Sequence, residues 1–137
     1  FFKVDGKFRS KIGISPMRSL PYCGSYDPDK NLLTVLWYSK PENAGEYVNS
    51  KWGKQDDPLK GDVINSYNDG PVEDGSIMGP FYEIESSSPA AKLKAGESIS
   101  HIQRIFHFVG SEEQLNPIAY KVFGLPVTEI KDVFAGK

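Results

Sequence analysis

The sequence predicts a mainly β fold with a short helix near its C-terminal end. Thirteen glycines and ten prolines are spread along the 137 residues and separate short apolar runs, as all-β proteins require. Apolar residues recur at helical spacing only after residue 110. The length suits a single hydrophobic core, so we expect residues 1–137 to form one domain.

Composition and charge exclude several classes of partner. Charged residues make up 25% and apolar residues 39% of the chain, which is typical of a folded protein. The net charge of -2 gives no concentrated basic surface, so no nucleic-acid partner is predicted. No apolar run approaches the roughly 20 residues of a membrane helix, so we predict no membrane insertion. The single Cys23 cannot form an internal disulfide.

The first third of the chain predicts a hairpin, a loop and a strand. In residues 1–15, the Asp5-Gly6 pair predicts the turn of a hairpin. One face of its second strand then holds alternate residues, namely Phe8, Ser10, Ile12 and Ile14. Residues 15–31 are rich in Pro, Gly, Ser and Asp without periodicity, which predicts a long loop. The run LLTVLWYS, residues 32–39, predicts a strand in the centre of a sheet.

The remaining predicted strands are short or mixed in polarity. Turns dominate residues 40–80, where only EYVNSKW and GDVINSY are strand-like. FYEIESS, residues 81–87, and ESISHIQRIFHFVG, residues 97–110, predict two further strands. Because a short segment with Pro89 and Gly96 connects them, we expect these two strands to pair with each other antiparallel.

A capping box and helical spacing predict the C-terminal helix. Ser111 and Gln114 match a capping box, and Gly124 suits the C-cap. The apolar residues at helical spacing are Leu115, Ile118, Ala119, Val122 and Phe123. Pro117 would remove a donor inside the helix, so we expect the helix to start at Asn116, with Pro117 in the first helical position. The stretch TEIKDVFAG predicts one more helical turn.

Two carboxylates share a face of the predicted strand 81–87. Side chains alternate along a strand, so Phe81, Glu83 and Glu85 point to the same side. The two glutamates are about 7 Å apart along the strand and could reach one ligand together. The alternative is that they form the solvated face of an edge strand.

The predicted strand 97–110 mixes polar and apolar residues on both faces. His101, Gln103 and His107 share one face, where buried polar groups must find partners or line a site. The two histidines are about 20 Å apart along the strand, too far to share a metal ion. We therefore predict no metal site and no cofactor. For each histidine, a structural hydrogen bond is the alternative to a functional role.

Residues 63–71, VINSYNDGP, gather amide and carboxylate oxygens at a tight turn. Asn65, Asn68 and Asp69 are either turn residues or ligand contacts, and their spacing does not match the helix-flanked calcium loop. No nucleophile motif and no phosphate-binding loop occurs. What remains is carboxylates, amides and aromatic residues, and these suit a hydroxyl-rich ligand such as a sugar.

Two segments carry a family resemblance. GDVINSYNDGP and GPFYEIESSSPAAKLKAGESISHIQRIFHFVG resemble a family of largely secreted bacterial proteins of uncharacterised function, itself similar to the galactose mutarotase-like supersandwich proteins. The resemblance implies an antiparallel β-sandwich and a periplasmic or extracellular location. It also implies that the chain is the C-terminal part of a larger domain. The chain starts at Phe1 rather than methionine, and we expect further sequence upstream.

The link to the aldose 1-epimerases in that superfamily rests on a shorter pattern. A strand that ends in glutamate is followed by proline, leucine, a Gly-Glu turn and a closing strand, matched by Glu85, Pro89, Leu93, Gly96, Glu97 and His101. This resemblance implies that Glu85 is a general base, with Glu83 as second candidate and His101 as a possible acid. The catalytic histidines of the epimerases lie upstream of this region.

Three functions follow as hypotheses. The first is carbohydrate binding, with a sugar or glycan as partner and Trp52 as a stacking surface; the candidate ligand-binding residues are Lys11, Trp52, Asn65, Asn68, Asp69, Gln103 and His107. The second is an epimerase-like enzyme that uses Glu85 as base. The third is an interaction module of a cell-surface assembly, whose partner is the missing N-terminal half or a second copy.

Overall fold

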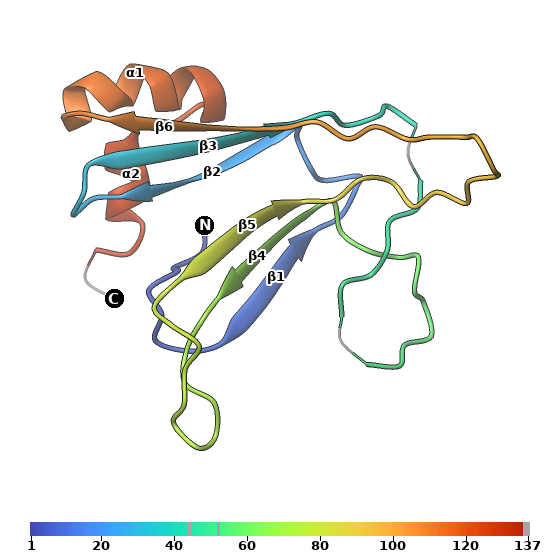
Figure 1. The fold of residues 1–137 in the computed structure, drawn as a ribbon. Coiled ribbons are helices and arrows are strands. Elements are labelled where there is room, and N and C mark those ends of the chain that lie inside the picture. The colour runs from blue at the N-terminus through green and yellow to red at the C-terminus, as the bar shows by residue number, and fades with distance from the viewer. Residues whose placement is uncertain (44, 52, 136–137) are drawn as a thin grey trace. The chain divides into compact units, whose positions relative to one another are not determined.

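The computed structural model describes residues 1–43, 45–51 and 53–135. Within these ranges, six strands and two helices follow in the order β1 (Ser10–Ile14), β2 (Tyr22–Asp27), β3 (Leu32–Tyr38), β4 (Ile64–Asn68), β5 (Tyr82–Ser86), β6 (Gln103–Val109), α1 (Glu112–Phe123) and α2 (Val127–Asp132). The strands form two three-stranded sheets, in the orders β1-β4-β5 and β2-β3-β6 (Figure 1). The predicted mainly β, antiparallel fold with a helical end is therefore confirmed.

The chain divides into two compact units. One consists of Phe1–Lys3, Tyr22–Trp37 and Arg104–Lys137, and it contains both helices and nearly all of the β2-β3-β6 sheet. The other consists of Val4–Pro21 and Tyr38–Gln103, and it contains the β1-β4-β5 sheet.

The helical unit has an apolar core between β3 and the two helices. β3 is the central strand, as its unbroken apolar run predicts. The buried side chains of this core are Leu33, Val35, Leu115, Ala119 and Val127. The rings of Tyr26, Phe108 and Phe123 pack against them. Alternation along the strands thus turns one face of the sheet toward the helices.

Strand β2 lies inside the segment that the sequence predicts as a loop, so that prediction is wrong for residues 22–27. β2 pairs antiparallel with β3 from Tyr22 opposite Trp37 to Asp27 opposite Leu32. The small and polar residues of YCGSYD show no alternation of apolar and polar residues, so the local sequence does not indicate a strand. Contacts with the rest of the unit stabilise it instead. The ring of Tyr22 lies 5.9 Å from that of Phe123.

Helix α1 begins earlier than predicted. Ser111 is the N-cap: its hydroxyl accepts from the Gln114 N–H at 3.4 Å, and its own N–H donates to the Gln114 side chain at 2.9 Å. The helix therefore starts at Glu112, and the predicted start at Asn116 is wrong. Pro117 is tolerated inside the helix because it lies on the exposed side, where water can replace one lost bond. The predicted C-cap is confirmed: Gly124 adopts a φ of 77°.

In the other unit, β4 is the central strand of the β1-β4-β5 sheet. Ser10 lies opposite Asn68 at one end of β1, and Ile64 lies opposite Ser86 at one end of β5. The predicted N-terminal hairpin is wrong, because β1 pairs with β4 and residues 1–9 form no strand. Gly6 does turn the chain, with a φ of 71°, but its N–H donates to the Asn68 side chain at 3.0 Å rather than to a facing strand.

Two further predictions are wrong, one on strand pairing and one on the extent of a strand. The strands predicted at 81–87 and 97–110 do not pair with each other: β5 pairs with β4, whereas β6 lies beside β3. Residues 97–102 form no strand, so β6 starts only at Gln103. Closeness in sequence favours a hairpin, but the longer-range partners β3 and β4 are the central strands of their sheets and are buried along most of their length, and these pairings prevail. The EYVNSKW piece contributes one isolated bridge, from Tyr47 to Lys60.

None of the helices in the described ranges is both long and apolar enough to span a membrane.

Candidate functional site

One side of the β1-β4-β5 sheet gathers the ionisable residues that the sequence singles out. In the strand register, Lys11 lies opposite Tyr67, which in turn lies opposite Glu83; the neighbouring row places Asn65 opposite Glu85. Directly opposed residues point to the same side of a sheet, with Cβ atoms about 5 Å apart. We call this side, defined by Lys11, Asn65, Tyr67, Glu83 and Glu85, the carboxylate face.

The two glutamates interact with each other and with one lysine. The Lys11 Nζ lies 3.7 Å from the Glu85 Oε2, and both side chains are about one-third exposed. A hydrogen bond between the two carboxyl groups raises the pKa of Glu83, since the protonated form of Glu83 can donate to Glu85. Glu85 therefore stabilises the protonated form of Glu83, and Lys11 lies beside Glu85.

Tyr67 leans away from the glutamates. Its hydroxyl donates to the Asp69 Oδ1 at 2.7 Å, and its ring centroid lies 5.8 Å from that of Phe81. The guanidinium carbon of Arg9 lies 5.7 Å from the same centroid. The Tyr67 ring therefore extends toward the Asp69 end of the sheet, and the Tyr67 side chain is buried there.

Asp69 anchors the loop that follows β4. Only 1% of its surface is exposed, and its Oδ2 accepts from the Gly79 N–H at 2.9 Å. The hydrogen bonds from the Tyr67 hydroxyl and from backbone N–H groups lower the pKa of Asp69, despite its burial. Burial raises the pKa of Tyr67, and its bond to Asp69 raises it further. Asp69 is thus committed to contacts within the protein.

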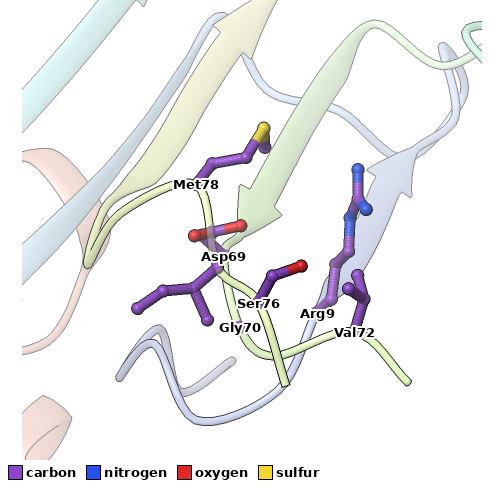
Figure 2. Close-up of a pocket in the computed structure, with 7 residues that line it drawn as sticks. Arg9, Asp69, Gly70, Val72, Ser76 and Met78 are labelled. Carbon is purple, nitrogen blue, oxygen red and sulfur yellow. The ribbon is translucent and has the colours of Figure 1, made fainter. Parts of the chain in front are cut away.

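A small pocket lies at the Asp69 end of the carboxylate face. Its volume is about 140 Å³, and its lining residues are Arg9, Asp69, Gly70, Val72, Ser76, Ile77 and Met78. Figure 2 shows Arg9 rising beside β1, while the other labelled residues come from the end of β4 and the loop beyond it. This volume is below the roughly 300 Å³ at which ligand pockets begin, so the pocket extends the face rather than replacing it.

Sequence reasoning missed Asp62 on this face. A side chain at Gly13 would collide with the carboxylate of Asp62, which therefore occupies the space above Gly13. Gly13 lies opposite Asn65, so Asp62 joins the row that ends at Glu85. No strand alternation signals this placement, because Asp62 precedes β4. Arg9 was also missed, and its alternation with Lys11 was the available signal.

The structure does not bring His101 to Glu85. The His101 Nε2 lies 2.9 Å from the Ser86 Oγ, and Ser86 points to the opposite side of β5 from Glu85. The Ser86 hydroxyl is also 2.7 Å from the Gln103 Oε1. His101 and Gln103 therefore form a separate polar cluster behind the carboxylate face.

The other predicted contacts are dispersed. The His107 Nδ1 lies 3.0 Å from the Thr34 Oγ1, within the β2-β3-β6 sheet. The Asn68 amide ties down the N-terminal segment: it accepts from Gly6 and donates to the Phe8 carbonyl at 3.0 Å. The Asn65 Oδ1 accepts from the Ser50 hydroxyl at 3.1 Å. Trp52 lies outside the described residues.

Comparison with known proteins gives a family and no function. The chain matches the model of a family of unknown function, DUF6786, over residues 1–134. No curated protein and no solved structure matches it. Among the described residues, no three His, Cys, Asp or Glu side chains gather as a metal-binding group.

Proposed function

The chain belongs to the DUF6786 family of unknown function, and because this membership assigns no activity, we propose one from the site: the carboxylate face binds a carbohydrate. The observation that carries the proposal is the grouping of the partly exposed side chains of Glu83, Glu85 and Lys11 on one side of the β1-β4-β5 sheet. The resemblance to mutarotase-like proteins supports the same ligand class. The galactose mutarotase-like supersandwich, its secreted location and the C-terminal position of the chain in a larger domain belong to this proposal as well.

The face offers the polar groups that sugar hydroxyls need. Ionised carboxylates accept two or more hydrogen bonds from neighbouring hydroxyls, and an ammonium group donates up to three. Glu85 and Lys11 already lie within 3.7 Å of each other, so adjacent hydroxyls could bridge them. Glu83 adds a carboxyl group that can both donate and accept when it is protonated.

Aromatic rings beside these groups provide an apolar surface. Phe81 is 37% exposed, and its ring lies next to that of Tyr67. The C–H groups on one side of a sugar ring can pack against such a surface while its hydroxyls reach the carboxylates. Polar and apolar contacts are thus available from one side of a single sheet.

Isothermal titration calorimetry with a panel of neutral mono- and oligosaccharides tests the proposal. We expect heat of binding with at least one sugar and a loss of at least tenfold in affinity for the double variant Glu83→Gln, Glu85→Gln. The matched control is Glu42→Gln, which changes an exposed carboxylate in the loop after β3 and should bind as the wild type does. Circular dichroism verifies that each variant is folded.

Two results would contradict carbohydrate binding at this face. One is the absence of heat with every sugar in the panel. The other is equal affinity of the wild type and the double variant, which would move the binding site elsewhere.

A second candidate, sugar mutarotation, is favoured by the hydrogen bond between the two glutamates. Ionised Glu85 would remove the proton of the anomeric hydroxyl while protonated Glu83 gives its proton to the ring oxygen. The bond between the anomeric carbon and the ring oxygen then breaks, and the reverse transfer closes the ring on the other face. Polarimetry of fresh α-glucose or α-galactose should show an accelerated rate that falls at least about 100-fold in Glu85→Gln. Equal rates for the two proteins would rule it out.

A further inference from the structure

Strand β6 exposes one edge of the β2-β3-β6 sheet. The Gly110 N–H donates to the Asn31 carbonyl at 3.2 Å, and the Ser39 N–H donates to the Ile102 carbonyl at 2.9 Å. These bonds show that even-numbered residues of β6 direct their backbone groups toward β3. The N–H and C=O groups of Gln103, Ile105, His107 and Val109 therefore point to the outer edge. No backbone hydrogen bond reaches that edge from elsewhere in residues 1–43, 45–51 and 53–135.

Several apolar side chains of β6 are exposed. Ile105 is 53% exposed, Phe106 43% and Val109 76%. Edge strands are normally protected from pairing by lysine, proline, a bulge or a covering segment. The seven residues QRIFHFV contain neither lysine nor proline, and Arg104 carries their one full charge. Edge strand β5, by contrast, carries two glutamates.

We propose that β6 pairs antiparallel with β6 of a second copy, around a two-fold axis at Phe106. In this register, Ile105 lies opposite His107 of the partner subunit, and Gln103 lies opposite Val109 of the partner subunit. These are the residues whose backbone groups point outward, so every free group on the edge gains a partner. The sheet then runs continuously through both copies.

The side-chain pattern fits this arrangement of two identical strands. A two-fold interface requires a surface that is complementary to itself. Arg104 lies opposite Phe108 of the partner subunit, so like charges do not face each other. The Arg104 guanidinium, whose carbon lies 5.3 Å from the Trp37 ring centroid, thereby gains a second ring. Phe106 meets Phe106 of the partner subunit at the axis, where an aromatic pair stabilises an antiparallel sheet.

One strand pair buries less area than a standard protein interface, so we expect a weak dimer with a Kd of roughly 10–100 μM. Sedimentation equilibrium of the full chain should show a dimer that dissociates on dilution. Ile105→Pro removes an outward N–H and leaves the bonds to β3 intact, so it should weaken the dimer at least tenfold. Tyr120→Lys is the matched control, because it removes an exposed apolar side chain from α1 and leaves the edge untouched.

Cysteine cross-linking tests the position of the axis. In the Cys23→Ser background, Phe106→Cys should form a disulfide-linked dimer on mild oxidation, because residues at the axis of a non-hydrogen-bonded pair have Cβ atoms about 4.5–5 Å apart. Arg104→Cys should not, since its two copies would lie about 14 Å apart.

Three outcomes would overturn the proposal. The first is a wild type that stays monomeric up to millimolar concentration. The second is cross-linking of Arg104→Cys as readily as Phe106→Cys. The third is a monomer in which the Ile105 and His107 amides resist hydrogen exchange, which would show that a strand of the same chain covers the edge.

Discussion

Each of the two sheets consists of three antiparallel strands, but the side chains of the two sheets differ in burial and charge. The β2-β3-β6 sheet turns Leu33 and Val35 into an apolar core beneath α1 and α2. The edge strands of the β1-β4-β5 sheet carry the partly exposed Lys11, Glu83 and Glu85 on one face, while Asn65 and Tyr67 of the central strand between them are buried. The backbone pattern is the same, so the residue types that alternate along the strands decide which sheet packs against the helices and which carries carboxyl groups.

This difference predicts where substitutions will be costly. A buried apolar side chain in the helical unit contributes transfer and packing energy that nothing else replaces. The carboxylates of the other sheet keep their contact with water and are coupled only weakly to folding. Stability should therefore depend on the first sheet and ligand binding on the second.

The largest expected effect is that of Leu33→Ala. Leu33 is completely buried in the core under the helices, so the variant should lose about 2–5 kcal/mol of the free energy of unfolding. Urea denaturation followed by circular dichroism at 222 nm reports on the helices of this unit. Tyr120→Ala is the control in the same unit; with 64% of Tyr120 exposed, it should change stability by less than about 0.5 kcal/mol. Equal losses in the two variants would contradict the assignment of the core.

The smallest effect is the pH dependence removed by Glu83→Gln. The hydrogen bond to Glu85 raises the pKa of Glu83 above its ordinary value of 4.5, so the folded protein binds this proton more tightly than the unfolded chain. The stabilisation is fully present below pH 4.5 and is lost as the pH rises through the folded pKa. Solvent screening limits it to roughly a few tenths of a kcal/mol.

The measurement is a set of urea midpoints from pH 4 to pH 8. Relative to the wild type, Glu83→Gln should lack the fall in midpoint that begins near pH 4.5, while Glu42→Gln should keep it. A difference in midpoint between the wild type and Glu83→Gln that stays constant from pH 4 to pH 8 would show that Glu85 does not raise the pKa of Glu83.

The sequence predicts the strongly patterned elements well. β3 combines length, β-branched residues and apolar continuity, and the capping box of α1 depends on residues only three apart. β2 could not be found in this way, because its residues are small and polar and its partners lie in β3 and the helices. The pairing of the strands could not be predicted either. β1 pairs with residues fifty or more positions downstream, and local sequence patterns carry no information on such a distant partner.

The candidate site was predictable only within one strand. Alternation places Glu83 and Glu85 on one face of β5, and the structure has them there. Which side chains face them from other strands depends on the register, so the approach of Lys11 had no signal in the sequence. The same limit applies to His101, whose serine partner directs it to the opposite side.

If the carboxylate face binds a sugar as proposed, the negative charge of Asp62 above Gly13 bears on which sugars it accepts. With Asp62, the face holds three carboxyl groups and Lys11 as the ammonium group beside them. Uronic acids and sugar phosphates would bring like charges within a few ångströms of these groups, where repulsion in a partly desolvated site amounts to kilocalories. Neutral sugars avoid this repulsion, and amino sugars would be attracted. Under the proposed function, Asp62, which fills the space above Gly13, would therefore disfavour anionic ligands.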